Sequence, residues 1–279
     1  TSLTPIEYDQ DVASAQVKSC LILSALHISG QSTFYEEVQT RDHTENLLEH
    51  LSYEINRDSK SLSLKGKQNL IAKDIFIGSD ISSAAFFIVA SLIVDGSCIE
   101  MRSVNINKLR TGIVTVLKGM GADIEISDIK KVSNELLGNI KVRYSKLKCA
   151  DIKGEIIPSL IDELPILFIA CASASGTSKI SGIEELRYKE SDRIMAMENG
   201  LKAIGINIRS SKDSIEITGG KIVGGKISSY DDHRIAMSFA IAGLISQHSL
   251  TIMNTQNIST SFPTFVTILR ELGVEVFEV

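Results

Sequence analysis

The sequence predicts an α/β fold, or α+β in the broader sense, built from four copies of one unit. Each copy has a polar cluster, an alanine-rich helix, a glycine, a strand, a loop, a second helix and a final strand. Glycine is favoured where a helix ends at a residue with positive φ. Such glycines recur after the first and second helices of the units: Gly30, Gly96 and Gly176, then Gly121, Gly205 and Gly273.

Two stretches of sequence define each unit. In chain order they are residues 11–38 with 41–55, 78–104 with 107–126, 159–183 with 189–208, and 231–255 with 261–279. The segments predicted as strands after the first helices mix β-branched and polar residues, as half-buried strands do: STFYEEV, SCIEMRSV, TSKISGI and SLTIMNT. The units are too long for the common helical solenoids. We therefore expect βαβαβ-like units whose helices pack inside sheets.

The repeat also predicts how the chain divides. Residues 74–279 hold three units, which suffice to close one globe, whereas residues 1–73 hold a single unit of another, incomplete globe. We expect the chain to be the C-terminal part of a longer protein. We also expect residues 1–73 to be more mobile, because apolar stretches such as CLILSALHI lack partners there.

Composition excludes several classes of protein. The net charge of −5 argues against nucleic acid as the main partner. The longest apolar run, Ala84 to Val94, is far shorter than the roughly 20 residues of a membrane span. The four cysteines lie far apart, which is typical of buried thiols in a reducing cytoplasm rather than of disulfides or a zinc site. The histidines lack metal-ligand spacing, so we expect a cytoplasmic protein without a metal.

Charged residues gather at three predicted helix starts: Arg41, Asp42, His43 and Glu45; then Arg187, Lys189, Glu190, Asp192 and Arg193; then Asp231, Asp232, His233 and Arg234. Capping accounts for Asp42, Asp192 and one of Asp231 and Asp232, and Asp42 with Glu45 is predicted to form a capping box. It does not explain Arg41, Arg193 and Arg234, because a cation is unfavourable at the positive end of a helix dipole. Three such arginines favour a bound anion over solvated surface charge.

Two further helix starts carry polar groups. Asp162 and Glu163 precede a very apolar helix, as an ordinary cap or as a carboxylate tuned for proton transfer. Ser14 and Gln16 begin another apolar helix, where they either cap it or bind a hydroxylated or phosphorylated ligand. Lys18 follows them, and we expect it to be a solvated charge rather than a ligand contact.

Eight motifs follow one another in the order found in one family: ASAQVKS, RDHTE, SSAAF, RTG, MGADI, KESDR, DHRIAM and TSFP. The chain resembles the EPSP synthases (3-phosphoshikimate 1-carboxyvinyltransferases) over essentially its whole length. The resemblance implies two globes, each made of three βαβαββ units with helices inside and sheets outside. It also implies transfer of the enolpyruvyl group of phosphoenolpyruvate to the 5-hydroxyl of shikimate 3-phosphate, without a cofactor. Helix N-termini are then expected to face a cleft for two anionic substrates.

The resemblance also implies roles for single residues. Asp162 and Glu190 match the proton-transfer carboxylates, and Asp162 also holds the hydroxyls of the acceptor. Gln16, Arg193 and Arg234 match contacts to phosphoenolpyruvate, and His233 matches either a contact near the leaving phosphate or a purely structural residue. The matches to contacts of shikimate 3-phosphate are Ser14, Ala15, Gln16, Arg41, Asp162 and Lys189.

The chain departs from the family pattern in its anion-binding residues. The lysine-serine…arginine motif and the G-N-S-G-T segment are absent, and Thr260 stands where some members have lysine. We therefore expect little turnover from this chain alone, with the missing N-terminal part as a possible partner. The alternatives are UDP-N-acetylglucosamine enolpyruvyl transferase, which shares the fold and donor, and a non-catalytic anion-binding fragment.

Overall fold

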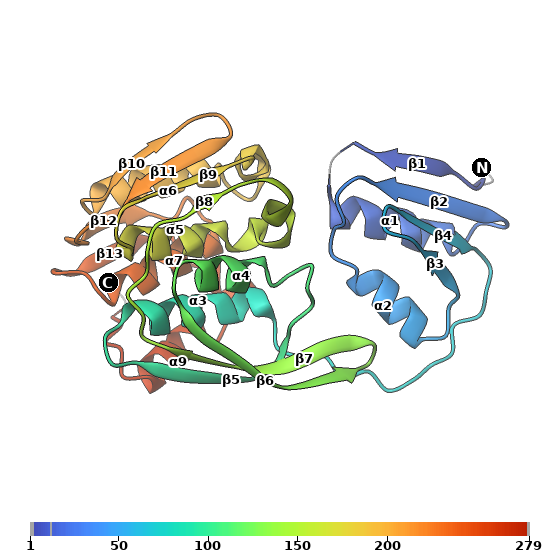
Figure 1. Cartoon of the computed structure of the whole chain (residues 1–279), viewed down its shortest axis with the longest axis horizontal. Coiled ribbons are helices and arrows are strands. Elements are labelled where there is room, and N and C mark those ends of the chain that lie inside the picture. Colours follow the sequence, from blue (N-terminus) through green and yellow to red (C-terminus); the bar gives the residue numbers. More distant parts are fainter. Residues whose placement is uncertain (1–2, 12, 278–279) are drawn as a thin grey trace.

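The computed structural model describes residues 3–11 and 13–277, which form two bodies lying side by side (Figure 1). We call residues 3–11 and 13–65 the first body and residues 81–277 the second body. Residues 66–80 connect them along one side. The boundary predicted at residue 73 falls inside this connection and stays a prediction.

The first body is a sheet covered by two helices. Its elements are β1 (Glu7–Gln10), α1 (Ala15–Ala25), β2 (Gln31–Glu36), α2 (His43–His50), β3 (Ile55–Arg57) and β4 (Ser61–Lys65). The strand order is β1-β2-β4-β3, in which β1 is parallel to β2 and the other neighbours are antiparallel. Ile22, Phe34, Leu48 and Leu64 join both helices and the sheet in one buried cluster.

The second body begins with α3 (Ile81–Ile93), β5 (Cys98–Asn105), α4 (Gly112–Gly119), β6 (Asp123–Val132), β7 (Glu135–Arg143) and β8 (Asp151–Ile152). It continues with the 3-10 helices η1 (Gly154–Ser159) and η2 (Ile161–Glu163), then α5 (Leu164–Ser173), β9 (Thr177–Ser181), the 3-10 helix η3 (Glu184–Tyr188), α6 (Arg193–Ala203), β10 (Asn207–Ser210) and β11 (Ser214–Thr218). It ends with β12 (Gly225–Ser228), α7 (His233–Gly243), β13 (Leu250–Met253), α8 (Ile258–Ser261) and α9 (Phe265–Glu271). Its sheets have the orders β5-β7-β6, β10-β11-β9-β8 and β12-β13.

Three apolar helices form the centre of the second body. Helices α3, α5 and α7 contact one another, and all residues of α5 from Leu164 to Ala172 are buried. A helix that is apolar all round is stable only in such a core. The sheets lie outside the helices (Figure 1), so the predicted mixed fold with inner helices and outer sheets is confirmed. None of the helices within residues 3–11 and 13–277 is long and apolar enough to cross a membrane.

The predicted unit is present in the order helix, strand, helix, strand in the first three copies. The six glycines that mark it all have positive φ, from 73° at Gly96 to 115° at Gly30. The last strand predicted in the fourth copy is wrong, because Val274 to Val276 is not a strand. The last strands of the first three copies, β3, β6 and β10, each pair with the next strand in the chain, β4, β7 and β11. Among the described residues no strand follows Val276, so the final segment has no such partner.

The expectation of buried thiols is correct for one of the four cysteines. Cys171 lies in the α5 core, where burial raises the pKa of its thiol to about 12. Cys20, Cys98 and Cys149 are free and exposed, so the expectation is wrong for them. For Cys98 the reason is its position at the start of β5, where every second residue faces away from the core.

Candidate active site

Asp162 lies where four cationic side chains from both bodies meet. The nearest to its carboxylate is Arg41 of the first body, whose Nη1 lies 3.1 Å from Asp162 Oδ2. From the second body, Arg110 Nη1 lies 3.7 Å from Oδ2 and Lys189 Nζ lies 3.8 Å from Oδ1. Arg234 Nη1 donates a 2.8 Å hydrogen bond to the backbone oxygen of Asp162. Each cation lies at or just before the start of a helix: α2, α4, α6 and α7.

These neighbouring cations determine the pKa of Asp162. Burial alone would raise the pKa of the carboxyl, but Arg234, Arg41, Lys189 and Arg110 together lower it below its ordinary value. Asp162 is therefore ionised at neutral pH and is available as a base and as an acceptor for hydroxyl groups. Neither Asp162 nor Glu163 forms a side-chain cap on the following helix, so capping does not account for this pair.

Glu163 is a second carboxylate, turned into the interior. Only 1% of it is exposed, and burial raises the pKa of its carboxyl. Ser82 Oγ donates to Glu163 Oε1 at 2.5 Å, and Arg110 Nη2 donates to the same oxygen at 3.3 Å. Two adjacent carboxylates thus have opposite surroundings, one facing convergent cations and the other held in the core.

A second cluster joins α6 to α7. Asp232 caps α7, accepting from Arg234 N at 2.9 Å, and also pairs with Arg193 Nε at 2.8 Å. Both members of this pair are almost fully buried. Arg193 Nη2 also donates to Glu190 Oε2 at 2.5 Å. One carboxylate therefore caps a helix and orients an arginine, which explains why acids and arginines crowd at this helix start.

Two other predicted residues border this cluster. His233 is the first residue of α7, and the pKa of its imidazole is lowered by partial burial and by Arg234, so it is neutral at neutral pH. Glu190 is half-exposed, with 54% of its side chain accessible, beside Lys189. Lys189 itself contacts Glu185 as well as Asp162.

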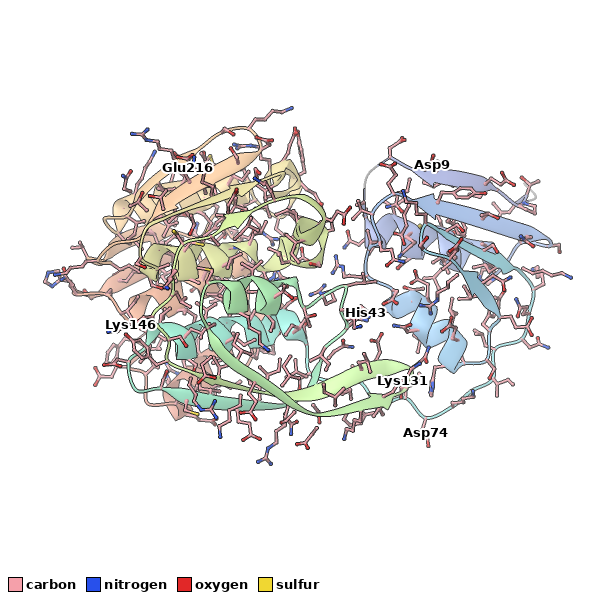
Figure 2. All side chains as sticks on the ribbon, viewed as in Figure 1. Asp9, His43, Asp74, Lys131, Lys146 and Glu216 are labelled. Carbon is pink, nitrogen blue, oxygen red and sulfur yellow. The ribbon has the colours of Figure 1, made fainter. Side chains whose placement is uncertain are left out.

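The five residues of RDHTE, 41 to 45, divide their contacts between the two bodies. Arg41 contacts Asp162, and Asp42 Oδ1 accepts from Asn107 Nδ2 at 2.6 Å. His43 Nδ1 lies 2.7 Å from Glu135 Oε1, at the start of β7. Figure 2 shows His43 at the boundary between the bodies, with the β6–β7 hairpin beside it. Three consecutive side chains thus join α2 to the second body.

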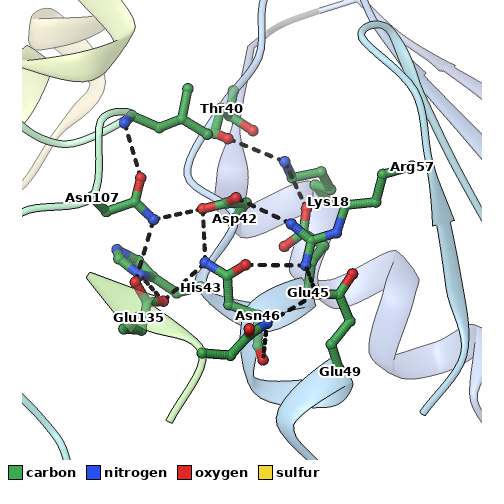
Figure 3. Close-up of polar contacts among 12 residues, drawn as sticks. Lys18, Thr40, Asp42, His43, Glu45, Asn46, Glu49, Arg57, Asn107 and Glu135 are labelled. Carbon is green, nitrogen blue, oxygen red and sulfur yellow. Dashed lines mark hydrogen bonds and ion pairs between the residues drawn. The ribbon is translucent and has the colours of Figure 1, made fainter. Parts of the chain in front are cut away.

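These contacts form one region, which we call the α2–hairpin contact. It consists of Asp42, His43, Asn46 and Glu49 of the first body with Asn107, Asn134 and Glu135 of the second (Figure 3). The predicted capping box is wrong, because the Asp42 carboxylate accepts from Asn107 and Arg57 and makes no cap bond. Tertiary donors have replaced the backbone N–H groups as its partners.

Lys18 is buried, and the expectation that it is solvated is wrong. Its side chain is 3% exposed, and Nζ lies 2.9 Å from both Glu36 Oε1 and Glu45 Oε1. It also donates to Thr40 O at 3.3 Å, next to Arg41. Lys18 therefore joins α1 and α2 and supports the backbone that presents Arg41 (Figure 3).

Ser14, Ala15 and Gln16 lie at the start of α1, one turn before Lys18. Ser14 caps this helix, accepting from Val17 N at 3.4 Å, which is one of the two roles that the sequence left open. Gln16 is exposed. Among the described residues, none of their hydrogen bonds reaches the Asp162 cluster. The structure thus brings together Arg41, Asp162, Lys189 and Arg234, while this helix start lies near them through Lys18 and Thr40.

Comparison with known proteins agrees with the motifs. A family model for EPSP synthase (3-phosphoshikimate 1-carboxyvinyltransferase) matches residues 1–269. The chain belongs to the EPSP synthase family. The 3-phosphoshikimate 1-carboxyvinyltransferase of Coxiella burnetii is 46% identical over 98% of the chain, and that of Petrotoga mobilis is 44% identical over 97%. The chain spans 63% of the length of each of these relatives.

Solved structures of the EPSP synthase family have the same fold. EPSP synthase from Acinetobacter baumannii superimposes with a TM-score of 0.90 at 41% identity, over 97% of the chain and 63% of that protein. The enolpyruvyl transferase NikO from Streptomyces tendae has a TM-score of 0.79 at 17% identity, over 98% of the chain and 65% of that protein. The second likeness supports the fold alone.

Arg110 was not predicted from the sequence as a member of the cluster around Asp162. Its signal was present, because Arg110 directly precedes the start of α4, as Arg41 precedes α2. It also belongs to the RTG motif, whose glycine has a packing reason. A Cβ at Gly112 would lie 2.1 Å from Ser159 Oγ, so glycine lets α4 approach η1 and sets Arg110 against Asp162.

Proposed function

We propose that this chain forms a large part of the active site of a 3-phosphoshikimate 1-carboxyvinyltransferase. The proposed reaction transfers the enolpyruvyl group of phosphoenolpyruvate to the 5-hydroxyl of shikimate 3-phosphate and releases phosphate. One observation carries it: an ionised Asp162 is surrounded by cations from both bodies, at the ends of several helices. Such a site suits a hydroxylated acceptor and two phosphate-bearing ligands.

In this proposal the acceptor binds between Asp162 and the cations of both bodies. Asp162 accepts the 5-hydroxyl proton as the oxygen attacks C2 of the donor, while its carboxylate also holds the neighbouring hydroxyl. Lys189 and Arg41 hold the acceptor phosphate and hydroxyls, together with Ser14, Ala15 and Gln16. Arg41 contacts Asp162 directly, so this contact is proposed to be exchanged in part for substrate oxygens when the acceptor binds.

Phosphoenolpyruvate is proposed to bind Arg193, Arg234 and Gln16. Glu190, which contacts Arg193, delivers a proton to C3 of the donor, giving a tetrahedral intermediate. Removal of a proton from C3 then expels inorganic phosphate and restores the double bond. His233 is neutral at neutral pH, so it is proposed to hydrogen-bond to the leaving phosphate rather than to pair with it. These residues need no cofactor for either step.

The chain by itself is proposed to have low activity. The chain spans 63% of the length of the Coxiella burnetii relative, and the family motifs that supply further cations are absent from its sequence. We propose that it binds substrate weakly and has little turnover, and that the remaining part of the family chain restores activity. A cytoplasmic location belongs to the same proposal.

The test is calorimetric titration of the chain with shikimate 3-phosphate. Asp162→Asn and Arg234→Ala are compared with Asp151→Asn and Arg102→Ala, whose exposed side chains pair with neighbours on the outer strands. We expect binding that the Asp162 change weakens about tenfold or more and that the outer changes leave unchanged. Tighter binding of UDP-N-acetylglucosamine would reject the proposed acceptor. Equal effects of inner and outer changes would reject the site.

A further inference from the structure

Three side chains behind Asp162 form a buried group. Ser82 from α3, Arg110 from the turn before α4 and Glu163 before α5 are 4%, 7% and 1% exposed. Ser82 and Arg110 both donate to Glu163 Oε1, and Arg110 also donates to Ser82 Oγ. A buried carboxylate is stable only when cations or hydrogen-bond donors surround it. Arg110 and Ser82 fill that role for Glu163.

Glu163 is also close to a second guanidinium. Arg234 Nη1 lies 3.5 Å from Glu163 Oε1, compared with 3.3 Å for Arg110 Nη2. The two arginines differ in exposure, because 17% of the Arg234 side chain is accessible and 9% of the Arg110 side chain is. One carboxylate oxygen therefore faces an inner arginine and an outer one, and only the outer one, Arg234, is proposed to contact phosphoenolpyruvate directly.

We propose that Arg110 is a positioning residue that keeps Arg234 available for the substrate anion by neutralising Glu163. With Arg110 in place, the charge of Glu163 is balanced from inside the body. Without Arg110, the nearest cation to this buried charge is Arg234, so its guanidinium turns inward and leaves the anion. This inference rests on the proposed function only in naming phosphoenolpyruvate as the anion.

A purely structural ion pair makes a different prediction. Removing one partner of a buried pair destabilises a protein, but it affects a ligand only through the folded fraction. The positioning role requires that Arg110 and Arg234 be energetically coupled, since both act on one oxygen. Residues that share a partner show such non-additivity, whereas independent residues do not.

The first test measures this coupling without any ligand. Urea unfolding is followed by circular dichroism for the natural chain, Arg110→Gln, Arg234→Ala and the double variant, at pH 8 to disfavour protonation of Glu163. We expect Arg234→Ala to lower the ratio of folded to unfolded protein about tenfold more when Arg110 is absent. Arg234 is then the nearest remaining cation for Glu163. Additive effects of the two changes would overturn the inference.

The second test measures anion binding with phosphoenolpyruvate and with inorganic phosphate as probes. Arg110→Gln is expected to weaken binding about tenfold although Arg110 is buried, and Arg234→Ala should then add little. Adding Glu163→Gln to Arg110→Gln removes the charge that attracts Arg234, so binding should return to within about threefold of the natural chain. Binding that stays as weak in this double variant as in Arg110→Gln overturns the inference.

Two further comparisons keep the tests decisive. Arg110→Lys retains the positive charge and is measured in both tests, so a failure of Arg110→Gln to fold leaves the question answerable. A lysine that behaves like glutamine would overturn a role based on charge. Absence of anion binding by the natural chain would reject the proposed function, while the unfolding measurements would still decide whether Arg110 and Arg234 are coupled.

Discussion

The guanidinium of Arg41 lies 3.1 Å from the carboxylate of Asp162, although the two residues belong to different bodies. The backbone next to Arg41 is fixed, because the backbone oxygen of Thr40 accepts a hydrogen bond from the buried Lys18. Asp162 is held by Arg234, which donates to its backbone oxygen. Each residue of this contact is therefore fixed within its own body, so the distance between the two side chains depends on the position of one body relative to the other.

Arg41→Ala should weaken binding of shikimate 3-phosphate by about 10- to 100-fold, the range for losing a charged hydrogen bond. It should also raise the pKa of Asp162, because Arg41 is one of the cations that lower it. Calorimetric titration measures the first effect, and its pH dependence below neutrality measures the second. Arg102→Ala, which removes an exposed arginine of β5, is the matched control. Unchanged affinity would place the acceptor phosphate elsewhere.

Glu135→Gln should loosen the α2–hairpin contact. Burial alone would raise the pKa of Glu135, but hydrogen bonds from His43, Asn46 and Asn105 lower it to about 2. The ionised form is thus favoured by folding, so this stabilisation is complete above about pH 4.5 and is lost as the pH falls toward 2. Hydrogen exchange in α2 and in residues 132–137 should rise in Glu135→Gln at pH 6.

The control for this prediction lies on the same hairpin. Asp128→Asn changes a carboxylate that bonds to Asn139 within the hairpin, away from α2. It should leave exchange in α2 unchanged. Between pH 5 and 2, the protection of the α2 amides relative to their intrinsic exchange rates should fall in the natural chain, whereas in Glu135→Gln it should depend less on pH. Equal pH dependence in the two proteins would show that His43 and Glu135 do not control the contact.

The helices of the fold were predictable, because local signals act within a few residues. Asp192 caps its helix as expected, and Ser14 and Asp232 do so as one of the alternatives that the sequence offered. The anomaly of arginines at helix starts also identified residues of the site, since helix dipoles disfavour cations there. Arg110 obeys the same rule and could have been found with it.

Other features depend on residues that are distant in sequence. Asp42 was expected to cap α2, but its carboxylate accepts a hydrogen bond from Asn107, which lies 65 residues later in the chain. Lys18 was expected in solvent, but Glu36 and Glu45 enclose it once α1 and α2 pack. Sequence also could not tell which of the adjacent Asp162 and Glu163 faces the core. In each case tertiary packing selects among partners that local patterns allow.

Lys18→Met should destabilise the first body by about 3–5 kcal/mol, since it leaves the buried Glu45 and the partly buried Glu36 without their cation. Burial already raises the pKa of Glu45, and Lys18 opposes that effect. Loss of Lys18 should therefore raise this pKa further, so the variant should regain stability as the pH falls from 8 to 5. Urea unfolding at both values measures this. Lys60→Met, which changes an exposed lysine of the same body, should have little effect.

Gly112→Ala should destabilise the second body by about 1–3 kcal/mol and weaken anion binding, because its Cβ would lie 2.1 Å from Ser159 Oγ and 3.1 Å from Leu160 Cβ. Relief of this clash moves α4 away from η1, and Arg110 moves with it. Gly119→Ala, in the same helix with open space around its Cβ, should be neutral or stabilising by up to about 1 kcal/mol. Adding Ser159→Gly to Gly112→Ala removes the shortest contact and should recover both properties in part, because the 3.1 Å contact with Leu160 Cβ remains. Thermal unfolding and phosphate titration measure them, and recovery of stability without recovery of binding would show that the position of α4 does not control the anion site.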